Sequence, residues 1–435
     1  MGIMATTYVT IPSGGSSTIV NGDTNVYGLG NATLKAGNGN DSVNILGNGS
    51  VSVGTGTDTI RVAGNGTVAA STASTAPDQV TVAGIGKVTL GGGANQVQLG
   101  SGSVQVGNGA NNVSVTGAAS VALGSGANTV VIGSGTVGGA SSGSSSESSG
   151  GSSSGASSGS TTGASGNNHV TVLGAGNVSL GNGNNTVLAG SGTVSVGNGN
   201  DAITVTGAGS VRAGTGNDSI SIGSGTVSVG TGADRVTMSG SGSIQAGSGA
   251  DSVSLGTGNN TVAATGTTSV SAAAGTNATI SNGSIQITNG PSLQTDKVAS
   301  GAVTILGGSG AVRFVGGTSN STASLKGGTG NDTFVGGAGK DTMQAGSGSN
   351  LFEFFKSTQT SALGGGAGGT HVIQGFNTAA GGSLYVEGYT LAQLQSLNAI
   401  KVVGGNTVIT LADKTSITLV GVTSLSANNI TTTAI

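Results

Sequence analysis

Residues 37–54 read GNGNDSVNILGNGSVSVG, which is two glycine-rich turns, each followed by a short run of alternating polar and aliphatic residues. Alternation with a period of two is typical of a β-strand, so Val43 and Ile45 should share one face of a first strand. Val51 and Val53 should share one face of a second strand. The glycines suit turns that need a positive φ or a close approach of neighbouring backbones. This unit therefore predicts two short strands per repeat.

The same unit recurs along the chain at a nearly constant step. Its acidic or amide position is 16 or 17 residues from the next, apart from one step of 20 and one of 40. A fixed period of this size indicates a solenoid with one coil per repeat. We predict an all-β fold, a parallel β-solenoid or β-roll of 16–17 residues per coil, with coils about 4.8 Å apart. The repeated positions are Asp41, Asp58, Asp78, Asn95, Asn111, Asn128, Asn168, Asn185, Asp201, Asp218, Asp234 and Asp251.

The composition is far from that of an ordinary globular domain. Of 435 residues, 89 are Gly, none is Cys and 6% are charged, whereas about 25% are charged in typical domains. Three Pro and no glycine at every third position exclude collagen. A net charge of -3 with scattered basic residues argues against a nucleic-acid partner. A nearly neutral, hydroxyl-rich surface favours self-association, and no apolar run is long enough to predict a transmembrane segment.

Two regions break the ladder. Residues 138–163 are almost entirely Ser and Gly and account for the 40-residue step, so we interpret them as a flexible insertion within one coil. Most aromatic residues lie after residue 301, which indicates a thicker core and a distinct C-terminal domain. Within it, residues 390–397 (TLAQLQSL) predict a short amphipathic helix. Residues 401–420 predict one or two hairpins.

Two consecutive nonapeptides carry the strongest chemical signal. Residues 327–335 (GGTGNDTFV) and 336–344 (GGAGKDTMQ) match Gly-Gly-x-Gly-x-Asp-x-U-x at every position. A third copy, AGSGSNLFE, has Ala345 for the first Gly and Asn350 for the Asp. This nonapeptide is the calcium-binding β-helix repeat of RTX proteins. Calcium needs six to eight oxygen ligands, which stacked turns can supply as backbone carbonyls and one carboxylate each.

These repeats make the chain resemble the RTX-type, or hemolysin-type, calcium-binding proteins of Gram-negative bacteria, which type I secretion exports. The resemblance implies Ca²⁺ as cofactor and an extracellular or cell-surface location without an N-terminal signal peptide. The tail at 419–435 (LVGVTSLSANNITTTAI) is similar to the uncharged secretion signals of that family. The first residues, MGIMATTYVTIPSGG, lack the basic and apolar regions of a signal peptide. The nonapeptide ligands that the resemblance implies are Gly327, Thr329, Asp332, Gly336, Ala338 and Asp341.

The expected organisation follows from the ladder and the resemblance together, with a C-terminal RTX and secretion-signal β domain. We assign an N-terminal segment to 1–20, the β-solenoid to 21–290, a transition to 291–326, nonapeptide repeats to 327–353, and a C-terminal cap with the secretion signal to 354–435.

The main ladder departs from the nonapeptide, because its second half-coil has no Asp and could bind calcium along one edge at most. Stacked aspartates would repel one another unless a cation sits between them. We therefore predict metal ligands at Asp41, Asp58, Asp201, Asp218, Asp234 and Asp251. For the amide positions we favour a hydrogen-bonded ladder, formed by Asn95, Asn111, Asn128, Asn168 and Asn185.

No enzyme motif survives inspection. His169 and His371 lie in different contexts and form no His-Glu-x-x-His motif. The Gly-x-Ser-x-Gly match at residues 151–155 lies inside the Ser/Gly insertion, without the strand and helix that a nucleophile elbow needs. We predict a non-enzymatic protein of the surface-layer or matrix type, with no catalytic residues.

The leading hypothesis for function is a secreted calcium-binding structural protein that self-assembles into an extracellular layer, fibre or biofilm matrix. Its partners would be further copies of itself, with cell-surface polysaccharide as a second candidate. An ice-binding or adhesive solenoid is the first alternative, since Thr and Asn rows suit ice, although the turn positions vary too much for a regular ice face. A carbohydrate-active solenoid enzyme is the second alternative, but the ladder lacks aromatic platforms and paired carboxylates.

Overall fold

The computed structural model describes residues 7–19, 21–139, 165–272, 276–281, 284–289, 294–298, 301–308, 310–317, 320–356, 368–378 and 381–434. The chain divides into two compact units, Met1–Ser221 and Ile222–Ile435. Apart from Gly138 and Gly139, the predicted Ser/Gly insertion lies outside the described residues.

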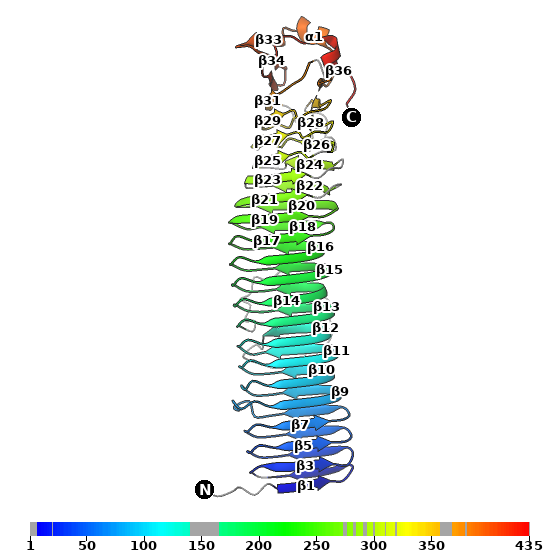
Figure 1. Cartoon of the computed structure of the whole chain (residues 1–435), viewed down its shortest axis with the longest axis vertical. Coiled ribbons are helices and arrows are strands. Elements are labelled where there is room, and N and C mark those ends of the chain that lie inside the picture. Colours follow the sequence, from blue (N-terminus) through cyan, green and yellow to red (C-terminus); the bar gives the residue numbers. More distant parts are fainter. Residues whose placement is uncertain are drawn as a thin grey trace. The chain divides into compact units, whose positions relative to one another are not determined.

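The first unit is a parallel β-solenoid. In its early coils each turn of the chain contributes two strands, and each strand pairs in parallel with its counterpart in the next coil (Figure 1). The strands are β1 (Thr7–Ile11), β2 (Gly15–Thr18), β3 (Thr24–Gly28), β4 (Ala32–Lys35), β5 (Ser42–Ile45), β6 (Gly49–Ser52), β7 (Thr59–Val62), β8 (Gly66–Ala69), β9 (Gln79–Thr89), β10 (Gln96–Gln105), β11 (Asn112–Leu123), β12 (Thr129–Gly139), β13 (His169–Ser179), β14 (Thr186–Ser195) and β15 (Ala202–Arg212). A further strand, β16 (Ser219–Ser228), begins in this unit and ends in the second.

The core is a thin aliphatic layer, in which equivalent residues of successive coils stack on one another. Val43 of β5 lies between Val26 of β3 and Ile60 of β7, so identical positions of successive coils stack directly. Val43, Ile45, Val51 of β6 and Val53 just after that strand are each at most 4% exposed. The predicted parallel β-solenoid with inward aliphatic side chains is confirmed. The first coil already begins at Thr7, within the stretch that we assigned to an N-terminal segment.

In the middle coils the two strands of a coil merge into one bent strand. β9 to β15 are 10–12 residues long, and in β10 the register shifts between Leu99 and Gly102 where the chain rounds the corner. Gly102 has a φ of 124°, and the carbonyl oxygen of Gly86 occupies the place that a Cβ would take. A Gly-x-Gly corner can therefore stay extended where we expected a turn between separate strands.

The second unit is built, within itself, on parallel stacking of the same kind. Odd-numbered strands such as β19, β21 and β23 pair with one another, as do even-numbered strands such as β18, β20 and β22 (Figure 1). The elements are β17 (Arg235–Met238), β18 (Gly242–Ala246), β19 (Ala250–Leu255), β20 (Gly258–Ala264), β21 (Thr267–Ala272), β22 (Thr276–Ser281), β23 (Ser284–Asn289), β24 (Gln294–Val298), β25 (Ala302–Leu306), β26 (Val312–Val315), β27 (Thr322–Lys326), β28 (Thr333–Val335), β29 (Lys340–Gln344), β30 (Leu351–Phe354), β31 (Thr370–Gln374), β32 (Ser383–Val386), α1 (Leu391–Ser396), β33 (Ile400–Val403), β34 (Asn406–Thr410), β35 (Ser416–Leu419), a 3-10 helix (Ala427–Asn429) and β36 (Ile430–Thr431).

The aromatic residues of this unit stack inside the parallel coils. Phe314 and Phe334 have ring centroids 4.9 Å apart, and Phe334 and Phe352 have centroids 4.8 Å apart, all three fully buried. Their spacing is that of neighbouring parallel strands. The thicker core that we expected to mark a distinct domain is thus a phenylalanine column within the coils of β26, β28 and β30.

The predicted helix and hairpins are both present near the C-terminus. β34 pairs antiparallel with both β33 and β35, and β35 joins the solenoid by parallel pairing with β31. In α1, the N-cap Thr390 accepts a bond from the Gln393 backbone while the Gln393 side chain accepts one from the Thr390 N–H. This reciprocal capping box fixes where the helix begins.

Removal of the cap should weaken this helix measurably. We expect Thr390→Ala to lower the local stability of α1 by about 1 kcal/mol, because an N-terminal N–H loses its partner. Hydrogen exchange of the peptide that contains α1 measures the effect. Gln395→Ala is the matched control, since it truncates an exposed side chain of the same helix outside the capping box; equal losses in both variants would contradict the capping role.

Candidate metal centre

The repeated acidic or amide side chains are buried at one corner of the coil and stack in a column. In the first unit each Oδ1 accepts a hydrogen bond from the backbone N–H of the coil before it. Thr24 donates to Asp41 at 3.1 Å, Asp41 to Asp58 at 2.9 Å, and Asp58 to Asp78 at 3.0 Å. The same bond repeats through the amide positions to Asp218. All these carboxylate and amide residues are at most 2% exposed.

In the asparagine coils the second polar atom of the side chain, Nδ2, also has hydrogen-bond partners. Nδ2 of Asn95 donates to Gly91 O at 3.1 Å, to Gly93 O at 2.9 Å and to Oδ1 of Asn111 at 3.0 Å. Bonds to the same turn carbonyls and to the next Oδ1 recur in the other coils of this type. Each asparagine therefore ties its own turn to the coil above it.

In the aspartate coils an oxygen takes the place of that nitrogen. Oδ2 is buried and without a hydrogen-bond partner in Asp41, Asp58, Asp78 and Asp201 of the first unit and in Asp251 of the second. By equivalence with the asparagine coils, this Oδ2 faces turn carbonyls and the Oδ1 of the next coil, all of which are acceptors. Buried charge without a partner is costly, so this position calls for a cation or a proton.

Burial also raises the proton affinity of these carboxyl groups. Desolvation raises the pKa of Asp58 to about 7, opposed by the hydrogen bond from the Asp41 backbone. Desolvation likewise raises the pKa of Asp41, Asp78, Asp201 and Asp251 above the ordinary value of 3.8. A cation bound at these positions would favour the charged form that burial disfavours.

Asp78 has the same geometry, although it was not among the predicted metal ligands. Its turn is longer and reads STAPD instead of Gly-x-Gly-x-Asp, which hides the motif. The position in the ladder is the signal that could have found it. In the second unit, Asp234 and Asp251 continue the arrangement, with the Asp234 N–H donating to Asp251 Oδ1 at 3.1 Å.

The nonapeptide aspartates lie at the two opposite corners of the coil. Asp332 precedes β28 of the even-numbered sheet, whereas Asp341 lies in β29 of the odd-numbered sheet. Oδ2 of Asp332 accepts from Gly328 N and Oδ2 of Asp341 accepts from Gly337 N, both at 3.1 Å. The two carboxylates therefore cannot bind one ion together. Each would bind a separate ion at its own corner of the coil.

The nonapeptide glycines make room for these carboxylates. A Cβ on Gly327 would lie 2.6 Å from Oδ2 of Asp332, so a side chain there would displace the carboxylate. The N–H groups of Thr329 and Ala338 donate to carbonyls of the preceding turn, and that of Gly336 donates to a carbonyl of the following coil. Their own carbonyl oxygens remain the candidate ligands that the motif predicts.

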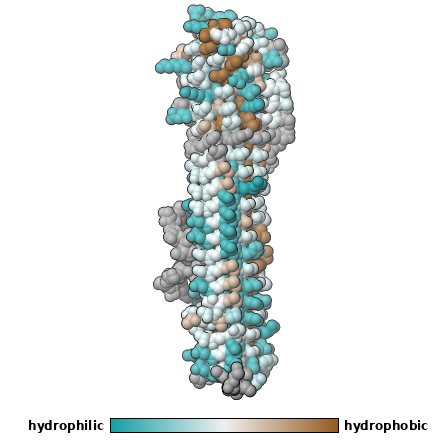
Figure 2. All heavy atoms as spheres, turned by 60° about the vertical axis from the view of Figure 1, so that its left-hand side comes forward, coloured by the Kyte–Doolittle hydropathy of each residue, from teal (hydrophilic) through white to brown (hydrophobic). Residues whose placement is uncertain are grey.

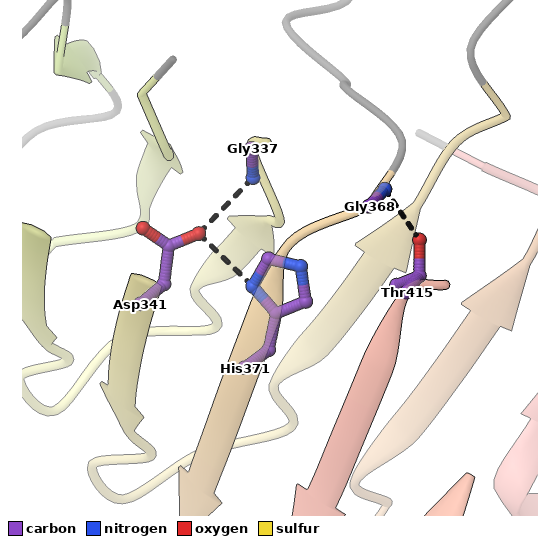
Figure 3. A network of polar contacts seen from close by, with 5 residues as sticks. All are labelled: Gly337, Asp341, Gly368, His371 and Thr415. Atoms are coloured by element: carbon purple, nitrogen blue, oxygen red, sulfur yellow. Dashed lines mark hydrogen bonds and ion pairs between the residues drawn. The ribbon is translucent and has the colours of Figure 1, made fainter. Parts of the chain in front are cut away.

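His371 occupies the position above Asp341 in the same column. Asp341 pairs in register with Ala323 on one side and His371 on the other. The His371 Nδ1 lies 3.0 Å from Asp341 Oδ2, and the fully buried ring contacts Phe354 at a centroid distance of 5.0 Å (Figure 3). Oδ1 of Asp341 has no hydrogen-bond partner. Sequence reasoning missed this contact, because the repeat is lost between residues 353 and 371.

The donor set matches a hard cation. Within the described parts of the chain, no three His, Cys, Asp or Glu side chains converge on one point. A transition-metal site is therefore not built there from side chains alone. Calcium accepts backbone carbonyls as readily as carboxylates. The buried Asp341 Oδ1, the glycine turns and their carbonyls fit this ion.

A family model for the RTX calcium-binding nonapeptide repeat matches the chain in four copies, at residues 236–265 and 321–352. The protein carries RTX calcium-binding repeats. The second range contains the nonapeptides quoted above. The first spans the nine-residue step from Asp251 to Asn260, which is half of a coil, because Asp251 pairs in register with Thr268, 17 residues further on. Comparison with curated proteins finds no match.

Calcium is accordingly the cofactor of this RTX-repeat protein, and such calcium-binding β-solenoids are typical of secreted proteins. Among the described residues, no helix has the length and apolar character that crossing a membrane requires.

Neutralising the Asp341 carboxylate should weaken calcium binding. We expect Asp341→Asn to lower the calcium affinity of its site by about tenfold, since ligand charge sets the affinity of calcium sites. Calorimetric titration of the full chain measures it. Asp413→Asn removes the same charge from a β34–β35 turn, where its Oδ1 accepts a local bond from the Thr415 backbone at 3.0 Å; calcium binding that is unchanged in Asp341→Asn would rule the site out.

Proposed function

We propose that this protein is a secreted, calcium-dependent structural protein that self-assembles into an extracellular layer, fibre or biofilm matrix. The observation that carries the proposal is the outer edge of the first described coil. Among the described residues, β1 pairs only with β3 and β2 only with β4, so no described strand covers the other edge of either strand. Unpaired strand edges are templates for a second chain.

The surface supports association between copies. Exposed amides form rows along the coils, such as Asn31, Asn48 and Asn65, each linked to the next by a backbone N–H to Oδ1 bond of 2.8–2.9 Å. Hydrophilic residues run in continuous rows along the stacked coils (Figure 2). Rows of ordered polar groups without net charge favour contact with identical rows on another copy.

Calcium would act as the folding switch after export by type I secretion. Cytosolic calcium is too low to fill weak sites, so the charged coils would stay unfolded until release, where calcium binding becomes folding free energy. The proposed ligands remain Asp332 and Asp341 with their turn carbonyls, together with the aspartates of the main ladder. The uncharged C-terminal tail would carry the export signal.

We infer a structural role and no catalytic one, because the buried acidic and amide side chains repeat in a column from coil to coil instead of gathering in one pocket. An adhesive role for the first unit is the second candidate. A groove of about 530 Å³ crosses its early coils and is lined by Asn31, Asn48, Thr67, Ile85 and Lys87 among others. Such a polar groove suits an extended neutral polymer such as a cell-surface polysaccharide.

Electron microscopy of the full chain in millimolar calcium and in chelator tests the proposal. We expect ordered fibres or sheets only with calcium. Thr7 N–H donates to Asp23 O, so alternation along the strand points the Thr10 N–H away from β3. Thr10→Pro should therefore block edge pairing without loss of an internal bond, whereas Thr10→Ala should assemble normally. Dispersed particles of the unaltered protein in calcium would contradict the proposed self-assembly and favour the adhesive role.

A further inference from the structure

The column of stacked acidic and amide side chains in the first unit is divided into blocks of aspartate and blocks of asparagine. Three aspartates are followed by five asparagines and then by aspartates again. The backbone N–H to Oδ1 bond is the same throughout. Only the second side-chain atom differs, which is Nδ2 in one kind of coil and Oδ2 in the other. At this corner the blocks therefore share the backbone bond to Oδ1 and differ in the partner that the second side-chain atom needs.

In the asparagine block the protein supplies every partner. Nδ2 of Asn111 donates to Gly107 O at 3.1 Å, to Gly109 O at 3.0 Å and to Asn128 Oδ1 at 2.9 Å. The Asn128 to Asn168 contact, at 2.9 Å, closes the column across the inserted residues between them. The last amide of the block donates to Asp201 Oδ1 at 2.9 Å. No charge is buried, so no ion is required.

In the flanking aspartate block the protein leaves the equivalent atom unsatisfied. Oδ2 of Asp41, Asp58 and Asp78 is buried without a hydrogen-bond partner. An acceptor at this place cannot bond to the carbonyl oxygens that Nδ2 contacts in the other block. With the carboxylates ionised, these coils are complete only when a cation lies between the oxygens.

We propose that the coils of Asn95, Asn111, Asn128, Asn168 and Asn185 form a calcium-independent folding core, onto which the aspartate coils add when calcium binds. This inference rests on the proposed calcium-dependent function and adds the order of events to it. In these coils the Nδ2 group of asparagine makes the contacts that a cation would make in the aspartate coils. The core would give the exported chain a template, since coils of a solenoid fold by propagation from a formed neighbour.

Hydrogen exchange of the full chain at neutral pH, with chelator and with millimolar calcium, separates the two parts of this account. We expect peptides from 95–123 and 168–195 to be protected in both conditions. Peptides from 41–62 and 332–353 should gain protection only with calcium. Exchange of the asparagine coils in chelator as fast as that of the aspartate coils would overturn the core, while calcium-dependent protection at 332–353 would leave the proposed function standing. Protection at 332–353 in chelator would instead count against the proposed calcium switch.

Two variants make the test specific. Asn111→Asp should abolish the protection of 95–123 in chelator, and calcium should restore it, because the substitution recreates the unsatisfied oxygen. Asn108→Asp is the matched control, since it adds the same charge to the same coil at an exposed turn, where Oδ1 still accepts from Ser125 N. Asp78→Asn should extend the metal-independent protection toward residue 78, because Asp78 is the aspartate next to the asparagine block. Equal behaviour of the Asn111 and Asn108 variants would overturn the proposal.

Discussion

Gly56→Ala should destroy the folding of the early coils of the first unit. Gly56 has a φ of 146°, and the carbonyl oxygen of Gly39 in the coil below already occupies the position of an added Cβ. The methyl group cannot be relieved by a rotamer change, because its neighbour is backbone. The two turns must separate, which breaks the hydrogen bonds that join them.

We expect a loss of more than about 4 kcal/mol in the free energy of unfolding, or no folded protein at all. Denaturant unfolding in calcium measures it. Gly22→Ala is the control, because Gly22 has a φ of 110° but no atom within 4 Å of its Cβ position. It should cost only the strain of a left-handed backbone, about 1–2 kcal/mol. Similar small losses in both variants would show that coil-to-coil contact does not require glycine.

The metal-free chain should be more stable at pH 5 than at pH 7.5. The folded-state pKa of Asp58 is raised by burial to about 7, and burial raises those of Asp41, Asp78, Asp201 and Asp251. The folded state thus holds protons that the unfolded state releases above pH 3.8. The stabilisation is fully present below pH 3.8 and is lost as the pH rises through the raised pKa values.

Asp58 alone would account for a loss of about 2–3 kcal/mol between pH 5 and pH 7.5. Urea unfolding in chelator at the two pH values measures the difference. Asp58→Asn should reduce the dependence of the free energy of unfolding on pH, because the amide needs no proton. With saturating calcium the trend should reverse, since the bound ion requires the ionised carboxylates. A metal-free stability that rises from pH 5 to pH 7.5 would contradict the burial of these groups.

The fold was predictable because one repeat specifies almost everything about a coil. The period set the coil length, and the alternation of Val43 and Ile45 set the inward face. The merging of strands in β9 to β15 was not predictable, because a Gly-Ser-Gly corner such as residues 100–102 permits both a turn and an extended bend. The phenylalanine column follows from register, which the residue types alone do not reveal.

The site was predictable in part. The motif identified Asp332 and Asp341, and the nine-residue step, half of a coil, implies their placement at opposite corners. Whether a ladder aspartate buries an unsatisfied oxygen depends on the orientation of the turn carbonyls, which composition does not reveal. His371 lies beyond the repeats, so its contact with Asp341 emerges only from strand pairing.

Far-ultraviolet circular dichroism of the metal-free full chain at neutral pH, titrated with calcium and separately with magnesium, tests the central claim that calcium completes this solenoid. We predict a partial β signal in chelator that rises cooperatively with calcium and not with magnesium, alongside calcium binding by calorimetry. A full β signal in chelator, unchanged by calcium and accompanied by no measurable binding, would contradict the account.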